Sequence, residues 1–270
     1  MRRPELLTYD LGRGACAFST ERSGGYSEGP YATFNANAYC GDDERAVLLN
    51  RDLLCGLLGL EASRLIMPHQ VHGARVRRID EAFFMQADAM GAAALEGVDA
   101  VMTDVPKVCV SVSTADCIPI LIYDRSHHAV AAVHAGWRGT VSRIAEAVLQ
   151  AMAGAYGTRP RDVEAAIGPG ISLEAFEVGD EVYEAFRTAG FPMGEMARRY
   201  PAAGGGNGRV EKWHLDLWQA NLGLLEGCGV PPARIHLAGV CTYLHSERFF
   251  SARRLGIRSG RILNGIFLTD

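Results

Sequence analysis

The chain is organised around one stretch, VCVSVSTADCIPILIYDRSHHAVAAVHAGWRGT, which spans residues 108–140. It contains three short apolar runs that are rich in β-branched residues and bounded by polar clusters, a pattern typical of buried strands. The runs are Val108–Val112, Ile118–Tyr123 and Ala129–Val133. Cys117 stands directly before the second run, and His134 directly follows the third. The sequence therefore predicts that a thiol and an imidazole lie at the ends of adjacent strands.

The composition of the 270 residues is that of a globular chain, with 48% hydrophobic and 21% charged residues. The net charge of −4 provides no basic field that would hold nucleic acid. No apolar run approaches the roughly 18 residues of a membrane span, and the N-terminal segment lacks the apolar core of a secretory signal. We expect a cytoplasmic protein without nucleic-acid or membrane partners, and the sequence does not define its oligomeric state.

Cysteine usage distinguishes one thiol from the others. The seven cysteines are odd in number and scattered, and no pair has C-x-x-C spacing, so a disulfide framework is not expected. Cys109 lies inside an apolar run and fits the role of a small buried hydrophobic residue. Cys117 follows Asp116 in a polar segment, which that structural role does not explain.

Helical patterns and strand patterns are mixed along the rest of the chain. Apolar spacing predicts helices over residues 44–58, 141–155 and 213–228. Asp42 or Asp43 is suited to be the N-cap of the first helix, and Thr140 that of the second.

The elements follow no strict alternation of strand and helix. We therefore predict an α+β fold, with layered mixed β-sheets covered by helices, as a single domain over residues 1–270. The glycine-rich loop Gly204–Gly208 is interpreted as an insertion rather than a linker, because the pattern resumes directly after it.

A second polar segment carries two histidines three residues apart, His69 and His72, beside a proline and a glycine. Residues three apart in an extended segment point to opposite faces, so only one is expected to be a direct metal ligand. His72, Cys117 and His134 together would offer two imidazoles and a thiolate, a set that suits zinc with an open fourth position. The same donors also take copper, and their spacing matches no compact metal motif.

Two other interpretations of these residues remain open. In a cysteine hydrolase, Cys117 would be the nucleophile and His134 its base, with His69 or Asp116 orienting the base. In a purely structural interpretation, the cysteine and the histidine are core residues beside a packed Trp-Arg corner. Arg138, flanked by glycines, would either bind an anion at a helix start or form an ordinary surface salt bridge.

Six ordered blocks of the sequence carry a family resemblance. They are QVHG at 70–73, TADCIPILIYD at 114–124, AVHAGWRGT at 132–140, AIGPGIS at 166–172, FEVGDEV at 176–182 and FFSARR at 249–254. Together they resemble the multicopper polyphenol oxidase (laccase) family, also called the purine nucleoside phosphorylase and peptidoglycan editing factor family.

The resemblance implies a fold, a metal site and a set of activities. Family members have layered mixed sheets and bind zinc through three residues that correspond here to His72, Cys117 and His134. The implied reactions are phosphorolysis of adenosine, inosine, guanosine and methylthioadenosine, and deamination of adenosine. Some members are described as copper-dependent phenol oxidases, and others are linked to removal of misincorporated amino acids from cell-wall precursors.

The leading hypothesis is a zinc-dependent enzyme that acts on a small-molecule nucleoside with phosphate. For deamination, zinc would activate water, and His69 or Asp116 would manage the protons. For phosphorolysis, Arg138 and Arg22 would hold phosphate, while Asn37 would contact the ribose or the base.

Two alternatives rank lower: a copper-dependent polyphenol oxidase and a Cys-His hydrolase acting on peptidoglycan precursors. Reduction of dioxygen by a laccase needs several coppers and many histidines to hold them. The chain has only eight histidines, and five of them are scattered.

Overall fold

The structure is a computed structural model that describes residues 3–201 and 211–269. The predicted insertion Gly204–Gly208 lies outside these residues. In the described part of the chain, no helix has both the length and the apolar character needed to cross a membrane.

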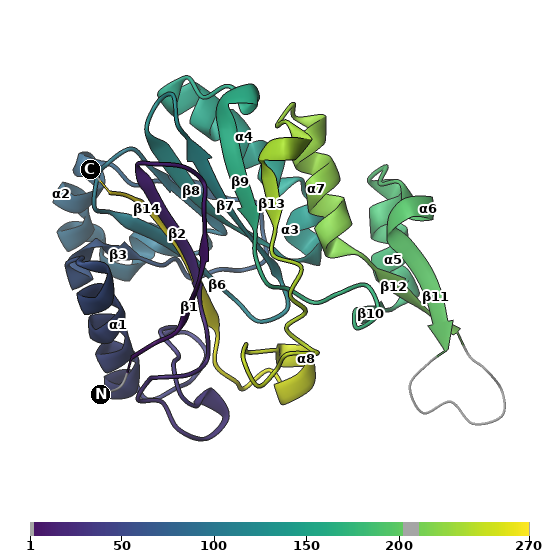
Figure 1. The fold of residues 1–270 in the computed structure, drawn as a ribbon, viewed down its shortest axis with the longest axis horizontal. Coiled ribbons are helices and arrows are strands. Elements are labelled where there is room, and N and C mark those ends of the chain that lie inside the picture. The colour runs from purple at the N-terminus through teal and green to yellow at the C-terminus, as the bar shows by residue number, and fades with distance from the viewer. Residues whose placement is uncertain (1–2, 202–210, 270) are drawn as a thin grey trace.

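The largest sheet has six strands in the order β13-β9-β7-β8-β5-β4. Figure 1 labels four of them, β13, β9, β7 and β8. Its strands are β4 (Val76–Arg78), β5 (Ala100–Thr103), β7 (Ile118–Asp124), β8 (Ala129–Ala135), β9 (Val163–Ile167) and β13 (Ile235–Leu237). The central hairpin β7–β8 is antiparallel, and its register places Pro119 opposite His134. The outer pairs β4–β5 and β9–β13 are parallel, so the sheet is mixed.

A second mixed sheet has five strands in the order β1-β2-β14-β6-β3. They are β1 (Leu6–Tyr9), β2 (Ala15–Thr20), β3 (Leu65–Ile66), β6 (Cys109–Thr114) and β14 (Ile262–Leu268). A small antiparallel sheet contains β10 (Glu177–Val178), β11 (Ala197–Pro201) and β12 (Glu211–Leu215). The strands predicted over residues 108–133 are therefore β6, β7 and β8, and they are divided between the two large sheets.

Alternating side chains pack the two large sheets against each other. Val110 and Val112 of β6 meet Leu121 of β7 and Val130 of β8 in one buried cluster, because successive side chains on a strand point to opposite faces. His134 belongs by alternation to the same face of β8 as Val130, so it points between the sheets. The apolar cluster between the two sheets therefore ends next to the imidazole of His134.

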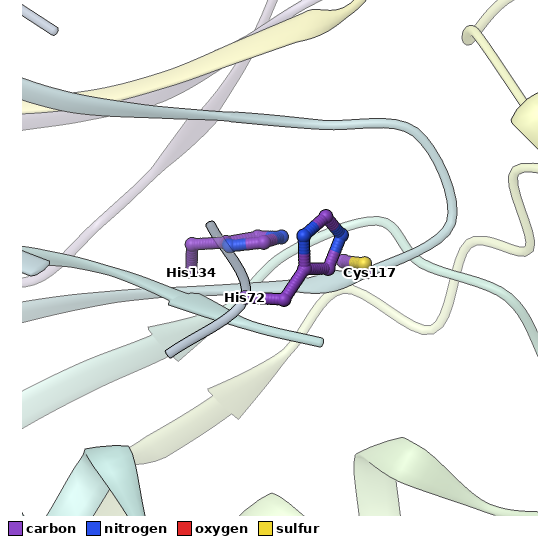
Figure 2. A group of neighbouring side chains, drawn as sticks. All are labelled: His72, Cys117 and His134. Carbon is purple, nitrogen blue, oxygen red and sulfur yellow. The ribbon is translucent and has the colours of Figure 1, made fainter. Parts of the chain in front are cut away.

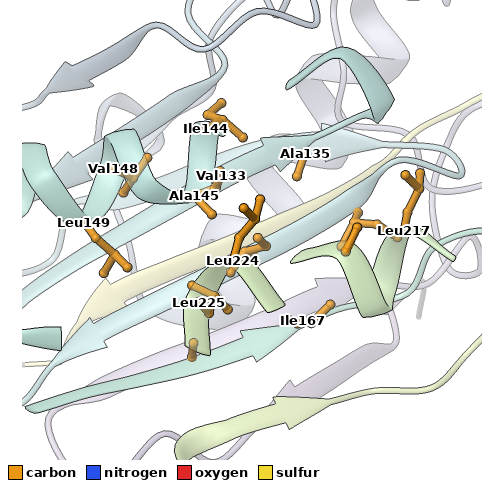
Figure 3. Packing of buried hydrophobic residues seen from close by; sticks show 14 of the residues in the cluster. Val133, Ala135, Ile144, Ala145, Val148, Leu149, Ile167, Leu217, Leu224 and Leu225 are labelled. Carbon is orange, nitrogen blue, oxygen red and sulfur yellow. The ribbon is translucent and has the colours of Figure 1, made fainter. Parts of the chain in front are cut away.

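Helices cover the outer faces of both sheets. Leu54 of helix α1 (Glu44–Leu58) packs with Phe18 and Phe267 of the five-stranded sheet. Helices α4 (Ile144–Tyr156) and α7 (Leu217–Gly227) cover the other sheet, where Val148 and Leu224 meet the side chains of β8 and β9 (Figure 3). The predicted α+β fold of layered mixed sheets covered by helices is confirmed.

The remaining α-helices are shorter. They are α2 (Glu81–Met90), α3 (Trp137–Val141), α5 (Asp180–Thr188), α6 (Met193–Met196) and α8 (Ala252–Leu255). The predicted first helix is confirmed as α1, and the Asp43 side chain caps it by accepting a hydrogen bond from the backbone N–H of Ala46.

The other two predicted helices have wrong starts. The second is interrupted, because Arg143 adopts left-handed backbone angles (φ 57°) between α3 and α4, and Thr140 lies inside α3 instead of capping a helix. The third begins only at Leu217, with Asp216 as its N-cap. Residues 211–215 pair with β11 as strand β12, so strand pairing overrides the helical pattern there.

Candidate metal centre and adjoining cavity

Three segments bring a cysteine and two histidines together. Cys117 stands directly before β7, and His134 is the second-to-last residue of β8. Since the two strands are antiparallel, the start of one lies beside the end of the other. His72 reaches the same point from the loop between β3 and β4. The ligand atoms of the three side chains all lie within 4.8 Å of one another (Figure 2).

A buried carboxylate orients the most buried of these ligands. His134 Nδ1 lies 2.8 Å from Asp99 Oδ1, and the Asp99 side chain has no exposed surface. An ionised carboxylate only accepts hydrogen bonds, so Nδ1 keeps its proton toward Asp99, and Nε2 is the nitrogen that binds a metal once its own proton is displaced.

The charges of the cluster favour a thiolate. Burial raises the pKa of the Cys117 thiol, but the positive charge and hydrogen bonds of His134 and His72 outweigh it and lower that pKa to about 6. Burial likewise lowers the pKa of His134, while the Cys117 thiolate and Asp99 raise it to about 9. Without a metal, the site therefore holds a thiolate beside an imidazolium at neutral pH.

The donor set fits a divalent cation that keeps an open coordination position. Two imidazoles and one thiolate are ligands that zinc accepts, and three protein ligands are typical of catalytic rather than structural zinc. The three residues span a range of exposure, with His134 buried, Cys117 half-buried and His72 exposed. The open side of the cluster faces a cavity of about 580 Å³ that all three residues line.

Metal affinity should fall as the pH is lowered. Between pH 6 and pH 9 the metal-free pair of Cys117 and His134 holds one proton, which a metal must displace. Binding at neutral pH should therefore release about one proton, and affinity should change about tenfold per pH unit. Chelator competition across this range, with calorimetry in buffers of different ionisation enthalpy, measures both quantities. An affinity independent of pH would contradict the assignment of the ligands.

Gly136 leaves the space that the cluster needs. A Cβ at this position would lie 3.0 Å from Cys117 Sγ and 3.1 Å from His72 Cδ2. Gly136→Ala should therefore displace two ligands and weaken metal binding by about tenfold or more, a loss within the range seen when outer contacts of metal sites are perturbed. Chelator competition provides the measurement. Gly154→Ala is the matched control, because a Cβ there meets nothing within 4 Å; equal affinities of the two variants would disprove the prediction.

His69 lies on the same cavity as the metal cluster. Its Nδ1 is 2.8 Å from both carboxylate oxygens of Glu96, and its ring stacks on Tyr39 with centroids 4.5 Å apart. Because the carboxylate holds Nδ1, the other ring nitrogen is available to a ligand. The predicted catalytic role of His69 stays a prediction, and Glu96, which orients it, was not found from the sequence.

Asp116 and Asn37 also line the cavity, but their polar atoms already have partners in the protein. The two carboxylate oxygens of Asp116 accept hydrogen bonds from the Thr242 hydroxyl and from the backbone N–H of Arg253, each at 2.7 Å. Asn37 donates to the Ser113 hydroxyl at 2.6 Å. These bonds shape the cavity wall, and the predicted catalytic and substrate-binding roles stay predictions.

The two arginines predicted to hold phosphate lie elsewhere than the cavity lining. Arg138 is exposed, with its guanidinium 4.3 Å from the centroid of the Trp137 ring. Arg22 donates to the backbone carbonyls of Ala32 and Ser246. The arginines that do line the cavity are Arg253 and Arg261. Neither was predicted from the sequence as a binding residue, although Arg253 lies within the FFSARR block.

The two packed mixed sheets and the His-Cys-His cluster beside a cavity define an α+β protein with a candidate metal centre. The chain belongs to the family described as multi-copper polyphenol oxidoreductase laccase, whose model matches residues 16–269. The predicted family resemblance is thereby confirmed.

Individual relatives resemble almost the whole chain. A purine nucleoside phosphorylase of Bacteroides thetaiotaomicron is 46% identical over 251 residues, which cover 93% of this chain and 90% of that protein. Adenosine deaminase RL5, from an unknown prokaryotic organism, is 44% identical over 94% of each chain. The crystal structure of YlmD from Geobacillus stearothermophilus matches with a TM-score of 0.84 and 32% identity, covering 97% of this chain and 94% of that one.

Proposed function

We propose that the chain is a zinc-dependent enzyme of purine nucleosides. It would catalyse phosphorolysis of adenosine, inosine, guanosine and methylthioadenosine, and deamination of adenosine. The observation that carries this proposal is the cluster of His72, Cys117 and His134 on a cavity that also holds arginines. The printed names of the two relatives, a purine nucleoside phosphorylase and an adenosine deaminase, support the same two reactions.

In deamination, the cluster and His69 would have different tasks. A divalent cation held by the cluster would lower the pKa of water toward about 7 and so supply a nucleophile for C6 of adenine. His69, oriented by Glu96, would carry a proton toward the departing amino group. Phe176 and Tyr39 provide aromatic surface in the cavity against which a purine can pack.

In phosphorolysis, the cavity arginines would hold the second substrate. A phosphate oxygen attacks the anomeric carbon while the bond from that carbon to the purine nitrogen breaks, which gives ribose 1-phosphate and the free base. Arg253 and Arg261 would bind the phosphate through charge-assisted hydrogen bonds. His69 would provide the proton that the departing purine takes up.

The placement of the donor residues supports nucleoside chemistry more than copper-dependent oxidation. A laccase needs several coppers and histidines to hold them, whereas the described residues contain one group of three or more candidate donors, His72, Cys117 and His134. The same donors also accept copper, and we propose zinc because it prefers catalytic sites with three protein ligands.

All seven cysteines are free, which supports a reducing, cytoplasmic setting.

Two assays test the proposed function. Metal content of the freshly purified protein is measured first, and zinc is expected. Adenosine is then supplied with and without phosphate: adenine and ribose 1-phosphate should appear only with phosphate, and inosine in both conditions. Absence of all these products from the zinc-loaded protein would refute the proposal. A chelator-resistant acyl-transfer activity would instead favour the Cys-His hydrolase.

A further inference from the structure

One buried carboxylate, that of Asp99, contacts both histidine-bearing segments of the candidate metal centre. Its Oδ1 lies 2.8 Å from His134 Nδ1 and accepts the backbone N–H of His72, also at 2.8 Å. Its Oδ2 accepts the backbone N–H groups of Gly73 at 2.8 Å and Val71 at 3.3 Å. The side chain has no exposed surface, so every polar atom of it is used inside the protein.

These bonds fix two independent features of the cluster. On β8, the carboxylate selects the His134 tautomer whose Nε2 faces the other ligands. In the loop, His72 adopts left-handed backbone angles (φ 64°), which cost energy for a residue with a Cβ. Three consecutive N–H groups bound to one carboxylate stabilise that conformation, and it presents the His72 ring to the cluster.

We propose that Asp99 is the positioning residue of the metal centre. It makes His134 and His72 act as one site although they are 62 positions apart in the sequence. Asp99 acts through its neighbours, since the candidate donor group consists of His72, Cys117 and His134. The proposal rests on the metal binding that is part of the proposed function.

Asparagine cannot replace this carboxylate, for a geometric reason. An amide has the same shape, but one of its two oxygens becomes an NH₂ group that only donates. If the NH₂ takes the place of Oδ2, it faces the N–H groups of Gly73 and Val71. If it takes the place of Oδ1, it faces the N–H of His72 and drives the proton of His134 onto Nε2, the nitrogen that must bind the metal. Each orientation therefore disturbs a histidine ligand, through the backbone of the His72 loop or through the tautomer of His134.

The chain contains a matched control for the loss of a buried carboxylate. Asp124, at the far end of β7 from Cys117, also has no exposed side-chain surface. Its Oδ2 lies 2.8 Å from His127 Nδ1, and its Oδ1 accepts the backbone N–H groups of Ser126 and His127 at 2.9 and 3.2 Å. Asp124→Asn therefore removes the same charge from the same kind of histidine and backbone contacts, away from the cluster.

The test compares zinc affinity in the full-length wild type, Asp99→Asn and Asp124→Asn by chelator competition. Asp99→Asn should bind zinc about 10–100-fold more weakly, the usual effect of losing an outer-shell partner, and Asp124→Asn should bind as the wild type does. Unfolding temperatures measured without zinc show what each substitution costs the fold. Unchanged affinity in Asp99→Asn would overturn the role of Asp99, whereas a wild type that binds no zinc would overturn the metal centre itself.

A measurement on the unmodified protein covers the case in which Asp99→Asn does not fold. Nitrogen-15 NMR of the zinc-loaded wild type, with His134 assigned, identifies the protonated nitrogen of the ring. Nδ1 should carry the proton and Nε2 should show the shift of a metal-bound nitrogen. Coordination through Nδ1 would overturn the proposal, because Asp99 could not then hold that nitrogen.

Discussion

Replacing Cys117 by serine is expected to remove the bound metal and to reduce both nucleoside activities by about 10³-fold or more, given that losing an outer-shell partner already costs 10–100-fold. The reason is the loss of the one soft anionic donor of the cluster. The Cys117 pKa of about 6 makes the thiolate available at neutral pH, whereas a serine hydroxyl stays protonated and binds zinc poorly. Metal content and both product assays provide the measurement.

Cys228→Ser is the matched control for this substitution. Cys228 is half-buried like Cys117 but lies at the end of α7, where it packs against the core beneath the six-stranded sheet. Its replacement should leave zinc content unchanged.

Chelation separates the two possible roles of Cys117. If Cys117 is a metal ligand, removing zinc from the wild type should abolish activity, whereas a thiol nucleophile would keep working. Full activity after chelation would therefore contradict the expected result.

The parts of the site that could be predicted from sequence are those that a local sequence pattern indicates. Cys117 and His134 flank two apolar runs, and consecutive runs of this kind pair as a hairpin, so their meeting follows from strand order. His72 was placed with them by donor chemistry and by the family resemblance. The single-domain organisation stays a prediction.

Residues that act across the fold carried no such signal. Asp99 and Glu96 each hold a histidine that lies 35 or 27 positions away in the sequence, so nothing adjacent to them marks their role. Arg253 reaches the cavity because Asp116, far away in sequence, accepts a hydrogen bond from its backbone N–H. The order of strands within each sheet decides these contacts, and composition or periodicity does not reveal that order.

The structure also explains one of the two glycines that flank Arg138 in the sequence. Gly136, two residues before Arg138, is explained by the close approach of Cys117 and His72 to the backbone. The need for a glycine at this position is therefore explained by the metal cluster, and the predicted anion-binding role of Arg138 stays a prediction. The sequence analysis and the lining of the cavity favour different arginines for phosphate: Arg138 and Arg22 in the first case, Arg253 and Arg261 in the second.

Replacing Arg253 by methionine is expected to separate the two activities. Phosphorolysis should fall about 10–100-fold, since a hydrogen bond to a charged group contributes about 1.5–3 kcal/mol. Deamination, which uses no phosphate, should change far less. The loss should appear mainly as a higher KM for phosphate at unchanged KM for the nucleoside, because Arg253 lines the cavity as a cation and methionine keeps much of its apolar stem.

Two further variants decide where the phosphate binds. Arg254→Met removes the neighbouring charge, which is exposed and lies against Tyr243, and should leave both reactions intact. Arg138→Met tests the site predicted from sequence. If Arg138→Met raises the KM for phosphate and Arg253→Met does not, phosphate binds beside Trp137 and the cavity arginines serve another purpose. The reverse result places both substrates in one cavity, within reach of the cluster of His72, Cys117 and His134.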